Sequence, residues 1–170
     1  MKAVLRDSRP ASGFNLVASD LCNEQEVREG YGRLISAAKA KGIAIDGIVL
    51  RRGTAAQPQL RVVAFRDPVF GVIVGCGVGA NFADVIDDFA LKQAPFDDSA
   101  ALELLQRLNV TRYTLKMDKA ASIPGLAQVV AHFSQLVAGA PWKRFTLEID
   151  PIEVGAGAPR ALDGNLFIGE

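Results

Sequence analysis

The chain has 170 residues, of which 49% are hydrophobic and 22% charged, with 19 basic and 19 acidic side chains. This length suits one domain or two closely apposed lobes, and the composition is typical of a folded globular protein. A formal net charge of zero argues against the basic surface of a nucleic-acid-binding protein. No apolar run approaches the roughly 18–20 residues of a membrane span, so we expect neither nucleic acid nor membrane as a partner.

The cysteines and the N-terminus bear on the cellular compartment. Cys22 and Cys76 lie far apart, and His132 is the only histidine, so one chain cannot assemble a closed Cys/His zinc site. The first residues, MKAVLRDSRPASGF, lack the apolar core of a signal peptide. We therefore expect reduced thiols and a cytoplasmic protein.

The first half of the chain predicts one helix followed by strands. Residues 23–42 carry apolar side chains at helical spacing, and Asn23 can cap the helix. Residues 45–53 are rich in β-branched side chains and predict a strand. Two more short apolar runs, 59–67 and 70–77, are joined by a tight turn and predict an antiparallel pair.

The second half is richer in helix. The pattern at residues 82–96 fits one helical face, yet its length and the flanking glycine and proline also permit a strand. Residues 97–109 and 123–140 predict amphipathic helices, and residues 144–155 and 159–169 predict two closing strands. This order of helix, strands, two helices and two strands predicts an α+β fold, not a regularly alternating sheet.

Residues 71–88, GVIVGCGVGANFADVIDD, contain a cluster of three glycines at 75, 77 and 79 that needs an explanation. A dinucleotide-binding fingerprint requires G-x-G-x-x-G between a strand and its helix, but Gly75, Gly77 and Gly79 are spaced G-x-G-x-G. A phosphate-binding G-x-x-x-x-G-K-[ST] loop is also absent from the sequence. Small residues here can instead let two backbones approach closely or let the sheet bend.

Two carboxylates near the C-terminus suggest a metal site. Glu148 and Asp150 are two residues apart, so on a strand both side chains leave the same face. Adjacent carboxylates repel each other unless a cation lies between them, and Mg²⁺ takes oxygen ligands. A solvated strand face remains the alternative, because Leu147 and Ile149 already account for burial on the other side. Pro151 is expected to break this strand.

Several stretches together resemble the nucleotide-binding part of the NDP-forming acyl-CoA synthetases, an ATP-grasp family related to succinyl-CoA synthetase. Residues 66–96, RDPVFGVIVGCGVGANFADVIDDFALKQAPF, are similar to a family run of D-P-x-F-G-P-x-V, a G-x-G-G turn, E-x-x-x-D and A-P. EVREGYGRLISAAKAKGIAIDGIVLRR is similar to an upstream helix and strand, and LEIDPIEV and ALDGNLFI to closing strands. The resemblance covers roughly residues 13–168.

The resemblance implies a fold. We expect an α+β, ATP-grasp-like lobe whose mostly antiparallel sheet is flanked by helices, at residues 13–170, after an N-terminal segment at residues 1–12. It also favours strand over helix for the ambiguous segment before Pro95, and implies that the glycines form the turn of that sheet.

The resemblance further implies a site for ATP and Mg²⁺, in which the metal ions bridge the ATP phosphates. Acidic residues of the last strands would hold the metal, and Lys92, just before A-P, would add a positive charge beside phosphate. The implied nucleotide-binding residues are Gln59, Gly77, Gly79 and Lys92, and the implied metal ligands are Asp84, Glu148 and Asp150.

The chain also departs from the family pattern. Gln59 replaces a glutamate, Ala80 replaces the last glycine of the turn, and Asp150 replaces the asparagine before proline. The first lobe, with its phosphate-contacting lysine, is not found before residue 13, where Arg6 at most takes that place. His132 lies in an amphipathic pattern and is expected to be an ordinary, partly exposed residue.

The implied function is the ATP-grasp lobe of an acid–CoA ligase, which makes acyl-CoA from a carboxylic acid, CoA and ATP through an acyl phosphate and a phosphohistidine. The CoA-binding and phosphohistidine parts would belong to another domain or subunit, and a homodimer is also considered. We do not expect the isolated chain to be an active enzyme. The alternatives are a degenerate, non-catalytic ATP-grasp-like module for assembly or regulation, and an unrelated α+β binding domain.

Overall fold

The computed structural model describes residues 1–6, 11–18, 21–50, 59–79 and 86–169. The chain forms two compact units, residues 1–56 and 57–170. The expected boundary after residue 12 falls inside the first unit, within the short 3-10 helix η1 (Ala11–Phe14). None of the described helices is both long enough and apolar enough to cross a membrane.

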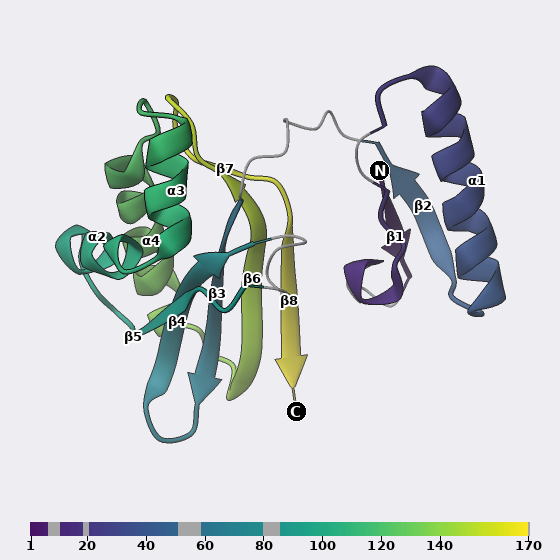
Figure 1. The fold of residues 1–170 in the computed structure, drawn as a ribbon. Coiled ribbons are helices and arrows are strands. Elements are labelled where there is room, and N and C mark those ends of the chain that lie inside the picture. Colours follow the sequence, from purple (N-terminus) through teal and green to yellow (C-terminus); the bar gives the residue numbers. More distant parts are fainter. Residues whose placement is uncertain (7–10, 19–20, 51–58, 80–85, 170) are drawn as a thin grey trace. The chain divides into compact units, whose positions relative to one another are not determined.

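The first unit pairs two strands and one long helix (Figure 1). Strand β1 (Lys2–Leu5) runs antiparallel to β2 (Ile45–Val49), and α1 (Glu24–Ala40) lies between them in the sequence. Asn23 caps α1 as expected, because its side chain accepts a hydrogen bond from the Glu26 amide at 2.9 Å. The buried apolar cluster of this unit consists of Ala3, Leu5, Ala11, Leu16, Leu34 and Ala38.

The second unit is an antiparallel sheet with helices on one face (Figure 1). Its strands are β3 (Leu60–Asp67), β4 (Gly71–Val78), β5 (Phe89–Gln93), β6 (Arg144–Glu153), β7 (Arg160–Ala161) and β8 (Gly164–Gly169). The strand order is β5-β4-β3-β6-β7, and β8 also pairs with β6. The helices are α2 (Asp98–Gln106), α3 (Asn109–Met117) and α4 (Ile123–Ala138). The expected α+β fold with a mostly antiparallel sheet is confirmed.

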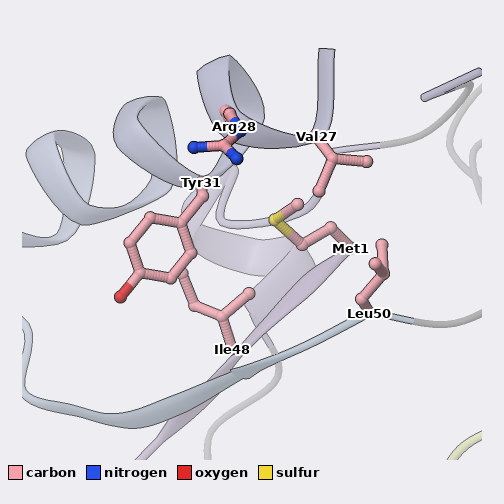
Figure 2. Close-up of a pocket in the computed structure, with 6 residues that line it drawn as sticks. All are labelled: Met1, Val27, Arg28, Tyr31, Ile48 and Leu50. Atoms are coloured by element: carbon pink, nitrogen blue, oxygen red, sulfur yellow. The ribbon is translucent and has the colours of Figure 1, made fainter. Parts of the chain in front are cut away.

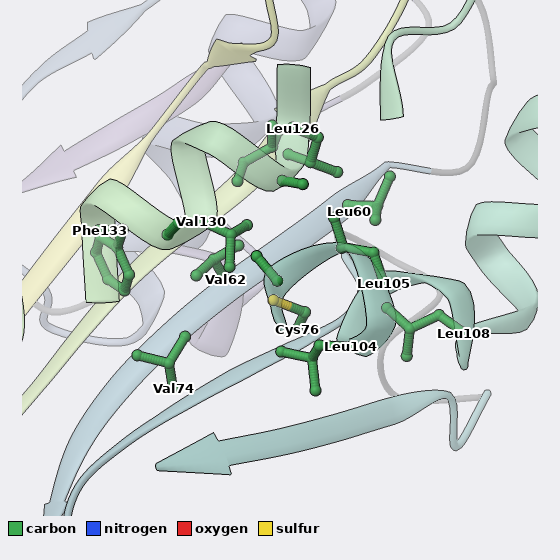
Figure 3. Packing of buried hydrophobic residues seen from close by; sticks show 14 of the residues in the cluster. Leu60, Val62, Val74, Cys76, Leu104, Leu105, Leu108, Leu126, Val130 and Phe133 are labelled. Carbon is green, nitrogen blue, oxygen red and sulfur yellow. The ribbon is translucent and has the colours of Figure 1, made fainter. Parts of the chain in front are cut away.

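The core of the second unit lies between the sheet and these helices (Figure 3). Strand β3 shows the alternation clearly: Leu60, Val62 and Ala64 are almost completely buried, and the residues between them point the other way. Cys76 of β4 lies in the same core, where burial raises the pKa of its thiol to about 12. The opposite face of the sheet, which we call the open face, carries no helix among the described residues of this unit.

Strand β6 does not end at Pro151, which corrects the expectation from the sequence. Val62 pairs with Ile149, and Leu60 pairs with Ile152. Between these two pairs β3 has one residue and β6 has two, so β6 contains a β-bulge. This bulge contains Pro151, and a proline that lies in a bulge removes no ladder hydrogen bond that the sheet needs. The strand therefore continues to Glu153, and its C-terminal part pairs with β7.

Helix α3 was not expected from the sequence. Its N-cap residue, Leu108, offers no side-chain hydrogen bond, so the local pattern has no start signal. The cap comes instead from Asp88, whose carboxylate accepts hydrogen bonds from the amides of Asn109 at 2.9 Å and Val110 at 2.6 Å. Of the ambiguous segment at 82–96, residues 89–93 are strand β5, while residues 82–85 lie outside the described part.

Candidate functional site

The open face of the sheet carries the two carboxylates that the sequence suggested as metal ligands. Leu147 and Ile149 of β6 pack against the core, so Glu148 between them faces the open side. Asp150 points the same way, because its Oδ1 lies 2.6 Å from where a Cβ would stand on Gly79. The structure thus places Glu148 and Asp150 on one face.

The surroundings of Glu148 disfavour its charged form. Partial burial raises the pKa of this carboxyl, and the negative charges of Asp150 and Asp163 raise it further, while Arg61 acts in the opposite direction. Because the pKa in the folded chain lies above that in the unfolded chain, the stability linked to the protonated form is lost as pH rises through the folded pKa. Above that pKa the charged carboxylate therefore costs stability, which a bound cation would relieve.

Asp163 is a member of this acidic group that reasoning from the sequence missed. It lies between β7 and β8, and its backbone carbonyl accepts a hydrogen bond from the Asp150 amide at 3.2 Å. Its charge contributes to the raised pKa of Glu148. The ALD of ALDGNLFI was the available signal, since its acid follows β7, which pairs with the strand β6 that carries Glu148 and Asp150. Within the described residues, however, no three His, Cys, Asp or Glu side chains are grouped closely enough to hold a metal ion.

The glycines have a packing role. Gly75 and Gly77 lie within β4, so the expectation that they form a turn is wrong for these two. A Cβ on either would collide with the ring of Phe89, which extends from β5 across both positions. A Cβ on Gly79 would meet the Asp150 carboxylate and the Leu60 carbonyl oxygen. The expected close approach of a second backbone is therefore found at Gly77 and Gly79, whereas the space at Gly75 is taken by side chains.

Arg61 forms an ion pair with one of the two carboxylates, Glu148, and was not among the site residues expected from the sequence. Its guanidinium lies 3.8 Å from the Glu148 carboxylate and 5.1 Å from the centre of the Phe89 ring. The signal was the alternation of β3, in which one arginine stands between two buried aliphatic residues and must face the open side.

The other expected nucleotide-binding residues do not gather around Glu148. Lys92 pairs with the buried Val74, and its neighbours Ala90 and Ala94 pack on the core, so Lys92 lies on the helix-covered face. Gln59 is close to the glycines through its backbone, because its carbonyl accepts a hydrogen bond from the Gly79 amide at 2.6 Å. Asp84 lies outside the described residues.

Two pockets are found among the described residues, and neither is lined by the carboxylates. One, of about 370 Å³, belongs to the first unit and is mainly apolar (Figure 2); it is lined by Met1, Val27, Arg28, Tyr31, Ile48 and Leu50. The other, of about 450 Å³, lies between the first half of α4 and the loop at 156–159. His132 lines it and is exposed on α4, as expected. Within the described part of the chain, the candidate site is therefore a face of the sheet and not one of these pockets.

Comparison with known proteins identifies the family. A family model described as an ATP-grasp domain matches residues 1–168. The beta subunit of acetate–CoA ligase (ADP-forming) I from Pyrococcus furiosus is 23% identical over 156 residues, covering 89% of this chain and 67% of that subunit. The 4-hydroxybutyrate–CoA ligase (ADP-forming) of Nitrosopumilus maritimus is 24% identical over 125 residues, covering 71% of this chain but 18% of that protein.

Solved structures show the same fold. Dinucleotide-forming acetyl-coenzyme A synthetase 1 of Ca. Korarchaeum cryptofilum, in complex with coenzyme A, Ca-AMPCP and HgCl+, matches with a TM-score of 0.76 at 18% identity, over 93% of this chain and 70% of that chain. A complex of the same synthetase with coenzyme A and Mg-AMPPCP matches with a TM-score of 0.69 at 17% identity, over 99% of this chain and 75% of that chain. The resemblance noted in the sequence is thus confirmed: this chain belongs to the ATP-grasp family and is similar to the ATP-grasp domain of ADP-forming acetyl-CoA synthetases.

Proposed function

We propose that this chain is the ATP-grasp part of an NDP-forming acyl-CoA synthetase and that the open face of its second unit contacts the phosphates of Mg-ATP. The observation that carries this proposal is the pair Glu148 and Asp150, directed to one open face with the charge of Asp163 beside them. Carboxylate oxygens suit a hard cation, and Mg²⁺ is commonly held by one or two carboxylates together with substrate phosphates.

The two carboxylates would therefore supply part of the metal's ligands, and phosphate oxygens would supply others. A Mg²⁺ ion held by these residues would offset the negative charge of the phosphates. The chain's own contribution is to hold Glu148 on the continuous strand β6 and Asp150 in its bulge, with Gly79 leaving space for the second carboxylate.

The relatives also support a proposal about the wider assembly. One of them is named as a beta subunit, and solved relatives were found with coenzyme A. We propose that a separate domain or subunit supplies the CoA-binding and phosphohistidine parts, so that acyl-CoA forms from a carboxylic acid, CoA and ATP only in the complete assembly. A homodimer and a cytoplasmic location remain parts of this proposal.

A second candidate function is a non-catalytic ATP-grasp module that serves assembly or regulation. Two observations favour it: Lys92 lies on the face opposite the carboxylates, and Arg61 already provides a positive charge beside Glu148. The two functions differ in whether the chain binds nucleotide in a metal-dependent way.

Calorimetric titration of ATP into the full chain, with and without Mg²⁺, tests the proposal. We expect binding that requires Mg²⁺ and that weakens by about tenfold or more in the Glu148→Gln/Asp150→Asn double variant, because the metal loses its protein ligands. The matched control is Glu103→Gln/Asp98→Asn, which removes two exposed charges from the helix α2. Absence of heat with the unaltered chain at millimolar ATP would contradict the proposal and favour the non-catalytic module.

A further inference from the structure

Arg61 has a position that its packing alone does not explain. It lies in β3 between Leu60 and Val62, both of which are buried beneath the helices, so the Arg61 side chain extends over the open face. Across the sheet it faces Gly77 on one side and the bulge of β6 on the other. Its side chain is 29% exposed, so a soluble ligand can reach it.

The contacts of the guanidinium leave most of its donors unused. The 3.8 Å separation from the Glu148 carboxylate is an ion pair rather than a short hydrogen bond. The buried Nε has no hydrogen-bond partner among the described residues. A buried donor without a partner costs about 1–3 kcal/mol, and an arginine can donate five hydrogen bonds. The site therefore holds a cation whose donors are oriented but not satisfied.

The guanidinium is also held in place. Its central carbon lies 5.1 Å from the centre of the Phe89 ring, within the range of a cation–π contact. The ring in turn lies across Gly75 and Gly77, where no side chain displaces it. A planar guanidinium supported from one side presents its edge to an incoming group, and phosphate oxygens fit that edge with two hydrogen bonds.

We propose that Arg61 binds a phosphate group of the nucleotide and that, without nucleotide, it lies beside Glu148 and competes with a metal ion for that carboxylate. This inference rests on the proposed function, because it places the phosphates beside Glu148 and Asp150. It adds a specific cation to that site, whereas Lys92, the phosphate-contacting cation expected from the sequence, lies on the other face of the sheet.

Replacement of Arg61 should change two affinities in opposite directions: that for a metal ion alone and that for the metal–nucleotide complex. Removal of the positive charge at residue 61 leaves Glu148 with less neutralisation, so a divalent metal alone binds more tightly. The same change removes donors from the phosphate, so the metal–nucleotide complex binds more weakly. A residue that merely supported Glu148 would weaken both kinds of binding when replaced.

The experiment compares Arg61→Met, Arg61→Lys and the control Arg112→Met in the full chain. Methionine keeps the apolar contact with Phe89, lysine keeps the charge without the planar fork, and Arg112 is an exposed residue of α3. Binding of Mn²⁺ alone is measured by the loss of its free EPR signal, and binding of Mg-ATP by calorimetry. Thermal unfolding followed by circular dichroism verifies that each variant is folded.

For Arg61→Met we expect a several-fold tighter Kd for Mn²⁺ and a roughly tenfold weaker Kd for Mg-ATP, with Arg61→Lys between it and the unaltered chain. The control should match the unaltered chain in both. Unchanged Mg-ATP binding in Arg61→Met, or weaker binding of both ligands, would overturn this inference and leave the proposed function standing. Failure of the unaltered chain to bind Mg-ATP would overturn both.

Discussion

At the scale of single residues, the open face depends on two positions of β4, Gly75 and Gly77, that have no side chain. Among the described glycines, Gly42 and Gly71 have a positive φ, whereas Gly75 and Gly77 do not. Backbone conformation is therefore not the reason for glycine at positions 75 and 77. Their requirement is spatial, because the Phe89 ring takes the volume that two side chains on β4 would fill. This ring also supports Arg61, so the packing of two glycines affects the electrostatics beside Glu148.

The two glycines should respond differently to substitution. At Gly75 a Cβ meets side-chain atoms of Phe89 and Leu91, whereas at Gly77 it also meets the Asp88 backbone oxygen at 2.5 Å. We expect Gly75→Ala and Gly77→Ala each to lower the free energy of unfolding by about 1–3 kcal/mol through overpacking. Adding Phe89→Ala should relieve the overpacking at residue 75 but not at residue 77.

Urea denaturation of the single and double variants measures this coupling. Gly47→Ala in β2 is the control, because no atom lies within 4 Å of the added Cβ, and we expect little change. Equal rescue of both alanine variants by Phe89→Ala would show that the backbone contact at Gly77 is without effect.

Much of the acidic site could be predicted from the sequence, and the failures have physical causes. The i, i+2 spacing of Glu148 and Asp150 was sufficient to place both on one face, because strand alternation is local. Asp163 was missed because the sequence gives no distance between β6 and the β7–β8 connection. The side of the sheet on which Lys92 lies depends on its register with Val74, which spacing alone does not fix.

At the scale of elements, helix α3 depends on a residue from another part of the chain. Asp88, just before β5, accepts hydrogen bonds from the first two amides of α3 and from the Asn109 side-chain amide at 3.3 Å. These are among the amides that a helix leaves without internal partners. The bond pattern connects the edge strand β5 to α3 and explains why local sequence rules predicted α2 and α4 but not the helix between them.

Asp88→Ala should therefore destabilise the second unit more than an ordinary cap substitution on the surface. The change leaves two helix amides and the Asn109 side chain without an acceptor at a position that is only 7% exposed. We expect the free energy of unfolding to fall by about 1–3 kcal/mol in a urea titration. Asp87→Ala, at the exposed neighbouring residue, is the control and should change stability little. A similar loss in both variants would argue against the capping role.

At the scale of the whole molecule, the chain has two hydrophobic cores that share no residue. The cluster of the first unit lies within residues 3–38, and that of the second lies within residues 60–154. Glu148, Asp150, Asp163 and Arg61 all belong to the second unit. The length and mixed composition suggested one domain or two lobes, and the separate core and the pairing of β1 with β2 define the first unit.

Residues 57–170 should consequently fold as an independent fragment. A unit of this size, with its own sheet and three helices, buries a core comparable to that of many small domains. We expect a single cooperative urea transition. We also expect Mn²⁺ binding like that of the full chain, because the fragment retains Glu148, Asp150 and Asp163. A non-cooperative transition, or loss of Mn²⁺ binding by a folded fragment, would show that the first unit is needed.

The shared volume at residues 75, 77 and 89 also constrains how this sheet can change during evolution. One aromatic ring occupies the space of two strand positions, so a larger residue at 75 becomes acceptable only after residue 89 has become smaller. Mutations at these positions are therefore conditional on one another, and their order matters. This dependence should appear as covariation among the three positions in related sequences. The backbone conformation at these positions does not itself restrict the residue type, so the shared volume is the cause.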